Sequence, residues 1–212
     1  MPVEIQKISL ESPEPGVVEY AGRFIRRGEV VGLPTDTFYA LSADPFNLAA
    51  VETVFRCKGR PETKALPILV NSIEQAVTLA RDVPHIFLEL ANRFWPGALT
   101  LVVRATHRLP LKVTGNTGRV ALRLPNSRVV TAVVEAVGGP ITGTSANLSG
   151  FPSCTNAHQI VKQLDNRLPL ILDGGDTGAT LASTIVRIDG DDYAIVREGA
   201  IPDADIHNAL GR

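Results

Sequence analysis

Three cations stand close together in the stretch Lys58-Gly59-Arg60-Pro61-Glu62-Thr63-Lys64, where a glycine and a proline constrain the turn. Hydroxyl groups are concentrated in two other stretches, Pro34-Thr35-Asp36-Thr37 and Gly143-Thr144-Ser145-Ala146-Asn147-Leu148-Ser149-Gly150. A polyphosphate site needs cations to neutralise its oxygens, and hydroxyls and backbone N–H groups to orient them. The combination indicates a nucleotide-using enzyme. Each stretch alone also fits a solvated basic turn or a simple polar turn.

An arginine inside an apolar segment is a further candidate, in Val120-Ala121-Leu122-Arg123-Leu124-Pro125. A guanidinium among apolar neighbours needs an anionic partner, because its desolvation is otherwise costly. The partner could be a protein carboxylate or a ligand carboxylate or phosphate, and the sequence leaves both open. The turn Gly174-Gly175-Asp176-Thr177-Gly178 lacks the Lys-Ser/Thr ending of a Walker motif, so we interpret it first as a turn.

Helices and short strands must position these residues. Apolar residues at helical spacing predict helices over residues 15–27 and 85–95, after caps at Asn47, Ser72, Ser127 and Thr155, and in a short segment from residue 202. Apolar and β-branched runs predict strands at 29–33, 66–70, 98–105, 120–125, 170–173, 183–188 and 193–197, the last two forming a hairpin. This alternation predicts an α/β fold with a twisted, mixed sheet flanked by helices. We expect one domain over residues 1–212, with its core at about 8–201.

The composition excludes several classes of protein. Apolar residues make up 44% of the 212 residues, and the net charge is −1, so no global field draws the chain to nucleic acid or membrane. Two distant cysteines do not suggest a disulfide framework or a metal site. The N-terminus lacks the apolar run of a signal peptide, and no stretch is long enough to span a membrane. We therefore expect a cytoplasmic protein without a membrane partner.

Seven blocks of the sequence resemble the YrdC-like family, the threonylcarbamoyl-AMP synthases. They occur in register from about Ile8 to Ile201, in the family's order, and the chain is similar to the short, single-domain form. The blocks are Pro34-Thr35-Asp36-Thr37-Phe38-Tyr39-Ala40-Leu41, Lys58-Gly59-Arg60-Pro61, Pro96-Gly97-Ala98-Leu99-Thr100, Arg123-Leu124-Pro125, Thr144-Ser145-Ala146-Asn147-Leu148-Ser149-Gly150, Ser183-Thr184-Ile185-Val186 and Arg197-Glu198-Gly199-Ala200-Ile201.

The resemblance implies a reaction and its partners. In the family, L-threonine, bicarbonate and ATP give threonylcarbamoyl-adenylate and pyrophosphate. The product serves the threonylcarbamoyl-adenosine modification of tRNA, normally through a downstream tRNA-modifying transferase. The family also implies a concave, positively lined face. Mg²⁺ is expected to arrive with ATP, without metal ligands from the protein.

Matching positions carry the family's site residues onto this chain. Those that match threonine-binding positions are Thr37, Arg123 and Ser183. Those that match ATP-binding positions are Arg60, Lys64, Ser145, Ser153 and Arg197, with Lys58 and Asn147 at the phosphate end. Arg119 falls where the family usually touches ATP through backbone. Two positions depart from the pattern: Ala40 replaces a glycine found in many relatives, and Leu69 replaces a histidine that holds threonine.

This site requires no nucleophilic side chain. The threonine amine would take up CO₂ derived from bicarbonate, and the resulting carboxylate would attack the α-phosphorus of ATP. We expect Lys58 and Arg60 to be the catalytic cations, since they would stabilise the charge of the leaving pyrophosphate. Arg123 would clamp the threonine carboxylate. The four histidines lie outside every matched block and are interpreted as surface or capping residues.

Two other functions remain open from sequence. A basic concave face could hold duplex RNA or tRNA through phosphate contacts alone, as a non-catalytic module, or weakly beside the enzymatic activity. A paralogue could keep ATP binding and use another acceptor substrate, because Ala40 and Leu69 depart from the family pattern.

Overall fold

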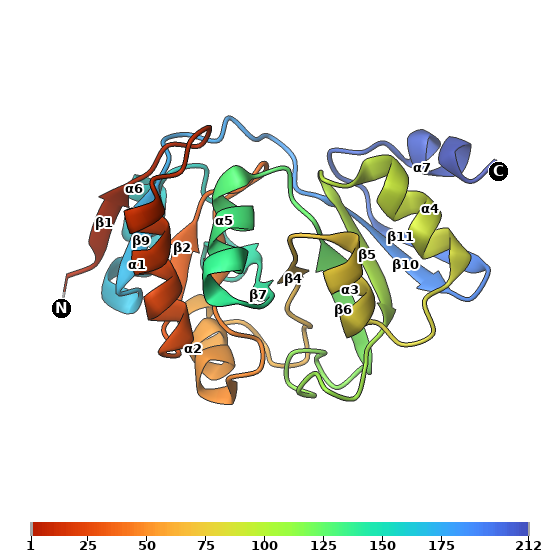
Figure 1. The fold of residues 1–212 in the computed structure, drawn as a ribbon, viewed down its shortest axis with the longest axis horizontal. Helices are drawn as coiled ribbons and strands as arrows, with labels where there is room; N and C mark the ends of the chain where they lie inside the picture. Colours follow the sequence, from red (N-terminus) through yellow and green to blue (C-terminus); the bar gives the residue numbers. More distant parts are fainter. Residues whose placement is uncertain (1, 212) are drawn as a thin grey trace.

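Two mixed sheets lie side by side along the long axis of the molecule (Figure 1). The structure, a computed structural model, describes residues 2–211. Over this range the strand order is β1-β9-β2-β3-β8 in the first sheet and β11-β10-β5-β6-β4-β7 in the second. The strands are β1 (Glu4–Lys7), β2 (Val31–Leu33), β3 (Ala40–Ser42), β4 (Ile68–Leu69), β5 (Leu99–Arg104), β6 (Arg119–Arg123), β7 (Ile141–Thr142), β8 (Thr144–Ser145), β9 (Leu170–Asp173), β10 (Thr184–Asp189) and β11 (Asp192–Arg197). The helices are α1 (Pro15–Arg26), α2 (Leu48–Lys58), α3 (Ile73–Leu79), α4 (His85–Phe94), α5 (Arg128–Val137), α6 (Ala157–Leu164), a 3₁₀ turn (Asp165–Arg167) and α7 (Asp203–Ala209).

Helices cover both faces of the first sheet, which explains the unbroken apolar runs of its central strands. Leu170 and Leu172 of β9 belong to the core cluster shared with α1 and α5. Ile171, between them, belongs to the cluster shared with α2 and α6 on the other face. Successive side chains of a strand point to opposite faces, so a strand covered on both sides needs apolar residues at every position.

Helices α3, α4 and α7 lie along one face of the second sheet (Figure 1). Leu99 and Leu101 of β5 are fully buried in the cluster that also holds residues of α4. Thr100 and Val102 alternate with them and therefore point the other way, into a cavity. The period of two along β5 thus separates a packed face from a face open to a ligand.

The chain passes from one sheet to the other at Gly143. Strand β7 pairs with β4 in the second sheet, whereas β8 pairs with β3 in the first. A Cβ built on Gly143 would lie 2.3 Å from Cγ of Leu69 and 2.8 Å from its Cδ1. Only a glycine lets the crossing segment approach β4 this closely.

The expected α/β class is confirmed, with the strands arranged in two mixed sheets. The predicted caps at Asn47, Ser72 and Ser127 are confirmed, and β10 and β11 form the predicted antiparallel hairpin. The predicted cap of α6 is wrong: Asn156 accepts from the Gln159 N–H at 3.0 Å, while the Thr155 hydroxyl instead contacts Asp176. Over residues 2–211, no helix combines the length and apolar character that a membrane span requires.

Candidate active site

A cavity of about 320 Å³ lies where the two sheets meet, and residues from both sheets line it. Seven of the ten site residues predicted from sequence are among its lining: Thr37, Arg60, Arg123, Ser145, Ser153, Ser183 and Arg197. They come from seven different parts of the chain between β2 and β11, so only the fold brings them together. The other three, Lys58, Lys64 and Asn147, do not line it.

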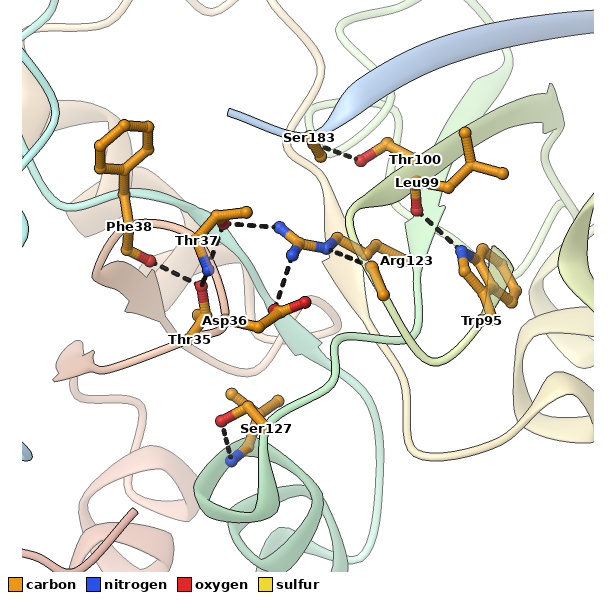
Figure 2. A network of polar contacts seen from close by, with 12 residues as sticks. Thr35, Asp36, Thr37, Phe38, Trp95, Leu99, Thr100, Arg123, Ser127 and Ser183 are labelled. Carbon is orange, nitrogen blue, oxygen red and sulfur yellow. Dashed lines mark hydrogen bonds and ion pairs between the residues drawn. The ribbon is translucent and has the colours of Figure 1, made fainter. Parts of the chain in front are cut away.

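Arg123 ends β6 and is held on three sides (Figure 2). Its Nη2 lies 2.6 Å from Asp36 Oδ1, its Nη1 donates to the Thr37 hydroxyl at 2.8 Å, and its Nε donates to the Gly97 carbonyl at 3.0 Å. The side chains of Arg123 and Asp36 are 8% and 15% exposed. Burial lowers the pKa of Arg123, and the Asp36 carboxylate opposes that shift. Of the two partners left open by the sequence, the structure shows the protein carboxylate, while Arg123 still faces the cavity.

A second arginine, Arg197 at the end of β11, is fixed against β10. Its Nε and Nη2 both donate to the Ser183 carbonyl, at 3.2 and 2.7 Å. The Ser183 hydroxyl lies 2.8 Å from that of Thr100, which also lines the cavity (Figure 2). Burial lowers the pKa of Arg197, and the charge of Arg123 adds to this effect. Thr100 is not among the site residues predicted from sequence, although a polar residue that alternates with leucines in a predicted strand indicates a position on the open face.

The turn after α2 places Arg60 in the lining of the cavity. Gly59 ends the helix with a left-handed φ of 58°, which turns the chain sharply. Arg60 then donates from Nη2 to the Ala65 carbonyl at 2.8 Å and lines the cavity, and burial lowers its pKa. The Lys64 side chain is exposed outside the lining.

Lys58 lies behind the cavity wall, 2% exposed. Its ammonium donates to the Ser145 carbonyl, to the Asn147 carbonyl at 2.9 Å and to Asn147 Oδ1 at 3.2 Å. Burial, and then the charge of Arg60, lower the pKa of Lys58 to about 7. An ammonium has three hydrogens, so these three oxygens use all of them. Through these hydrogen bonds Lys58 holds the loop that carries Ser145 in place.

The same hydrogen-bond network orients the Ser145 side chain. Its hydroxyl donates to Asn147 Oδ1 at 2.5 Å, so Asn147 acts behind the wall as well. Arg119 points elsewhere, pairing with Asp189 and donating to the Ile188 carbonyl. Arg119 is not among the residues that line the cavity.

The two departures from the family pattern both lie in the cavity wall. Ala40 of β3 and Leu69 of β4 are among its lining residues. Leu69 is 2% exposed and packs on Gly143. The side chains of Ala40 and Leu69 are apolar and offer no hydrogen bond to a ligand.

The cavity's chemistry follows from its lining. Three guanidinium groups and several hydroxyls surround it, and the lining residues within 2–211 include no aspartate, glutamate, histidine, cysteine or lysine. Across this described part of the chain, no group of three or more histidine, cysteine or acidic residues is placed to hold a metal. Such a site suits an anionic ligand and can act on it by positioning and charge stabilisation. The fold and the site thus define an α/β protein with a cavity lined by guanidinium and hydroxyl groups between two sheets.

The chain belongs to the Sua5/YciO/YrdC family. The family model, described as "Telomere recombination", matches residues 23–199. A protein of Pyrococcus abyssi named threonylcarbamoyl-AMP synthase is 36% identical over 95% of this chain and 59% of its own length. One of Bacillus subtilis with the same name is also 36% identical, over 95% and 58%. The crystal structure of P. abyssi Sua5 complexed with L-threonine superposes with a TM-score of 0.94 at 35% identity, covering 99% of this chain and 61% of that one. The chain thus spans about three fifths of the length of these relatives.

Proposed function

We propose that the chain forms L-threonylcarbamoyl-adenylate from L-threonine, bicarbonate and ATP and releases pyrophosphate, as a nucleotidyltransferase. The observation that carries this proposal is the convergence of Arg60, Arg123 and Arg197 on one cavity whose described lining holds no carboxylate, histidine, lysine or cysteine. The names of the relatives and the threonine-bound Sua5 structure support the same reaction. We infer that one domain with its core at about residues 8–201 carries the activity in the cytoplasm, and that a downstream tRNA-modifying transferase consumes the product.

The threonine end of the cavity would be built by Arg123, Thr37 and Ser183. The guanidinium of Arg123 has five N–H groups, of which its protein partners use three. Two therefore remain for the carboxylate of the amino acid. The Ser183 hydroxyl, held near Thr100 and Arg197, would complete this end.

The ATP end would be built by Arg60, Arg197, Ser145 and Ser153, which all line the cavity. Lys58 and Asn147 would act from behind, by holding Ser145 in place. Lys64 would reach a phosphate only from its exposed position outside the lining.

The reaction balances without a protein nucleophile. Bicarbonate gives CO₂ and hydroxide. The amine of threonine adds to the CO₂ and its proton goes to the hydroxide, so that an N-carboxylate and water are formed. One oxygen of that carboxylate forms a bond to the α-phosphorus of ATP, and the bond to the bridging oxygen breaks. Pyrophosphate leaves with the electron pair of that bond. The guanidinium groups would offset the repulsion between the two reacting anions, an effect typically worth several kcal/mol.

We expect Mg²⁺ to be held by the phosphates of ATP. The described residues contain no cluster of metal ligands, and the cavity lining contains no carboxylate to supplement the phosphates. When bound, Mg²⁺ would neutralise part of the phosphate charge.

The test is pyrophosphate release from ATP with and without L-threonine and bicarbonate. We expect release only when all three substrates are present, and mass spectrometry should detect threonylcarbamoyl-adenylate. Release indifferent to threonine would rule out the substrate assignment. Tight RNA binding with a steep salt dependence, without turnover, would instead favour the RNA-binding alternative.

A different amino-acid acceptor is the second candidate. The observation in its favour is the apolar side chain of Leu69 in the cavity wall, where many relatives carry a histidine. Pyrophosphate release measured across the standard amino acids would separate the two. Faster release with an acceptor other than threonine would favour the second candidate.

A further inference from the structure

The segment between β8 and α6 has no regular secondary structure of its own. Over residues 146–156 the backbone belongs to no helix or strand, so its N–H and C=O groups need partners elsewhere. The segment carries Asn147, which holds the Ser145 hydroxyl, and Ser153, which lines the cavity. The partners of its backbone therefore decide where these groups stand.

Two glutamines of α6 supply such partners. Gln159 and Gln163 are one helical turn apart, so they lie on the same side of the helix, and both are half-buried. Oε1 of Gln159 accepts from the Thr155 N–H at 2.8 Å. Oε1 of Gln163 accepts from the Leu148 N–H at 3.1 Å, and its Nε2 donates to the Pro152 carbonyl at 2.9 Å.

The two hydrogen bonds of Gln163 join the backbone at Leu148 to the backbone at Pro152. The orientation of the amide is fixed, because an N–H can bind only its oxygen and a carbonyl only its NH₂ group. Pro152 directly precedes Ser153. Gln163 is not among the residues that line the cavity. It therefore acts on the wall through the backbone next to Ser153.

The backbone is held on both sides of Ser153. Gln163 binds the carbonyl before it, and the Tyr39 N–H donates to the carbonyl of Cys154, after it, at 2.9 Å. Proline has no N–H, so the carbonyl is the one backbone group through which Pro152 can form a hydrogen bond. Removing the Gln163 donor therefore removes one of the two contacts that hold this part of the wall.

We propose that Gln163 is a positioning residue that sets the place of Ser153 at the ATP end of the cavity. This inference rests on the proposed function for the identity of the ligand. It adds a residue outside the lining and a chemical requirement at that residue. The side chain at position 163 must offer an acceptor and a donor at once, as an amide does, whereas an ionised glutamate of the same length offers only acceptors.

The test measures the affinity of the whole chain for ATP and for L-threonine by isothermal titration calorimetry. We expect Gln163→Glu to weaken ATP binding by about tenfold, the value of one hydrogen bond, because the Pro152 carbonyl loses its donor. The affinity for L-threonine should stay unchanged, since Thr37, Arg123 and Ser183 lie on other segments. A general weakening of the fold would lower both affinities.

A double-variant cycle tests whether Gln163 acts through Ser153. Ser153→Ala should itself weaken ATP binding. In that background Gln163→Glu should cause a smaller further loss than it causes alone, because the hydroxyl that it positions is already gone. Gln75→Glu is the matched control: Gln75 accepts from the Asn71 N–H at 3.1 Å, a role that glutamate keeps, so both affinities should equal those of the wild type.

Each outcome decides the inference. A folded Gln163→Glu variant with unchanged ATP affinity, with an equal loss of L-threonine affinity, or with a loss that simply adds to that of Ser153→Ala overturns the role of Gln163 and leaves the proposed function standing. A wild-type chain that binds no ATP overturns both.

A variant that does not fold is replaced. If circular dichroism shows Gln163→Glu to be unfolded, Gln163→Met, which removes both hydrogen bonds at similar size, decides by the same comparisons. If neither folds, Ser153→Ala decides alone, since unchanged ATP affinity in that variant contradicts a positioned Ser153.

Discussion

The Asp36 carboxylate lies 2.6 Å from Nη2 of Arg123, and the two form a largely buried ion pair beside the cavity. Asp36 is not among the lining residues, so it holds the guanidinium from behind while Arg123 faces the ligand space. A neutral pair at this point avoids an uncompensated charge inside the protein.

Removing the Asp36 carboxylate should therefore lower the stability of the fold. We expect Asp36→Ala to lower the free energy of unfolding by about 3–5 kcal/mol, because it leaves the buried Arg123 unpaired. Asp36→Asn keeps an acceptor for Nη2 and should lose less. Urea denaturation checks both, with Asp205→Ala on the exposed face of α7 as control. A loss no larger than that of an exposed pair, about 1 kcal/mol or less, would contradict a buried clamp.

Arg60 should carry much of the charge stabilisation. Arg60→Ala should lower threonine-dependent pyrophosphate release by about 10²-fold or more, the usual effect of losing one oriented transition-state contact. Lys64→Ala should cause a smaller loss, because its side chain lies outside the lining. Circular dichroism should show both variants folded, and Arg56→Ala, which removes an exposed arginine of α2, serves as control. Unchanged pyrophosphate release by the Arg60→Ala variant would contradict the proposed role of Arg60 in charge stabilisation.

Lys58 should make the stability depend on pH. Its pKa is lowered from 10.5 to about 7 in the folded chain, so between these values the unfolded chain binds more protons. The free energy of unfolding should therefore rise with pH across that window, relative to Lys58→Met. Urea denaturation of both proteins at about pH 6.5 and about pH 9 measures the difference. A difference independent of pH would show that the three oxygen acceptors keep Lys58 charged throughout.

Gly143 and Leu69 should be coupled. Gly143→Ala should cost about 1–3 kcal/mol of stability, because its Cβ would lie 2.3 Å from Leu69 Cγ. Leu69→Ala alone should cost about 2–5 kcal/mol through lost packing. In the double variant the alanine Cβ would have room, so the combined loss should be at least about 1 kcal/mol below the sum of the single losses. Additive losses in urea denaturation would contradict this close approach.

Much of the local structure could be predicted because its causes are local. The Asn47 side chain accepts from two backbone N–H groups of α2, and Gly59 supplies the left-handed residue that ends it. The one wrong cap, Thr155, stands next to the true cap Asn156, and both residue types favour that position. The Asp176 carboxylate accepts a hydrogen bond from the side chain of each, a contact between distant segments that the local sequence does not show.

The sequence by itself determined the set of cations and hydroxyls, the α/β class and the family to which they belong. The tertiary structure decided which of them share one space. The turn after α2, the end of β6 and the end of β11 bring Arg60, Arg123 and Arg197 to one cavity. Lys58, two residues before Arg60, instead turns into the protein and binds the loop at Ser145 and Asn147. Residue type and spacing fix what a side chain is able to do. The direction in which it points depends on contacts between segments far apart in the chain, and the hydrogen bonds already made there decide what it has left for a ligand.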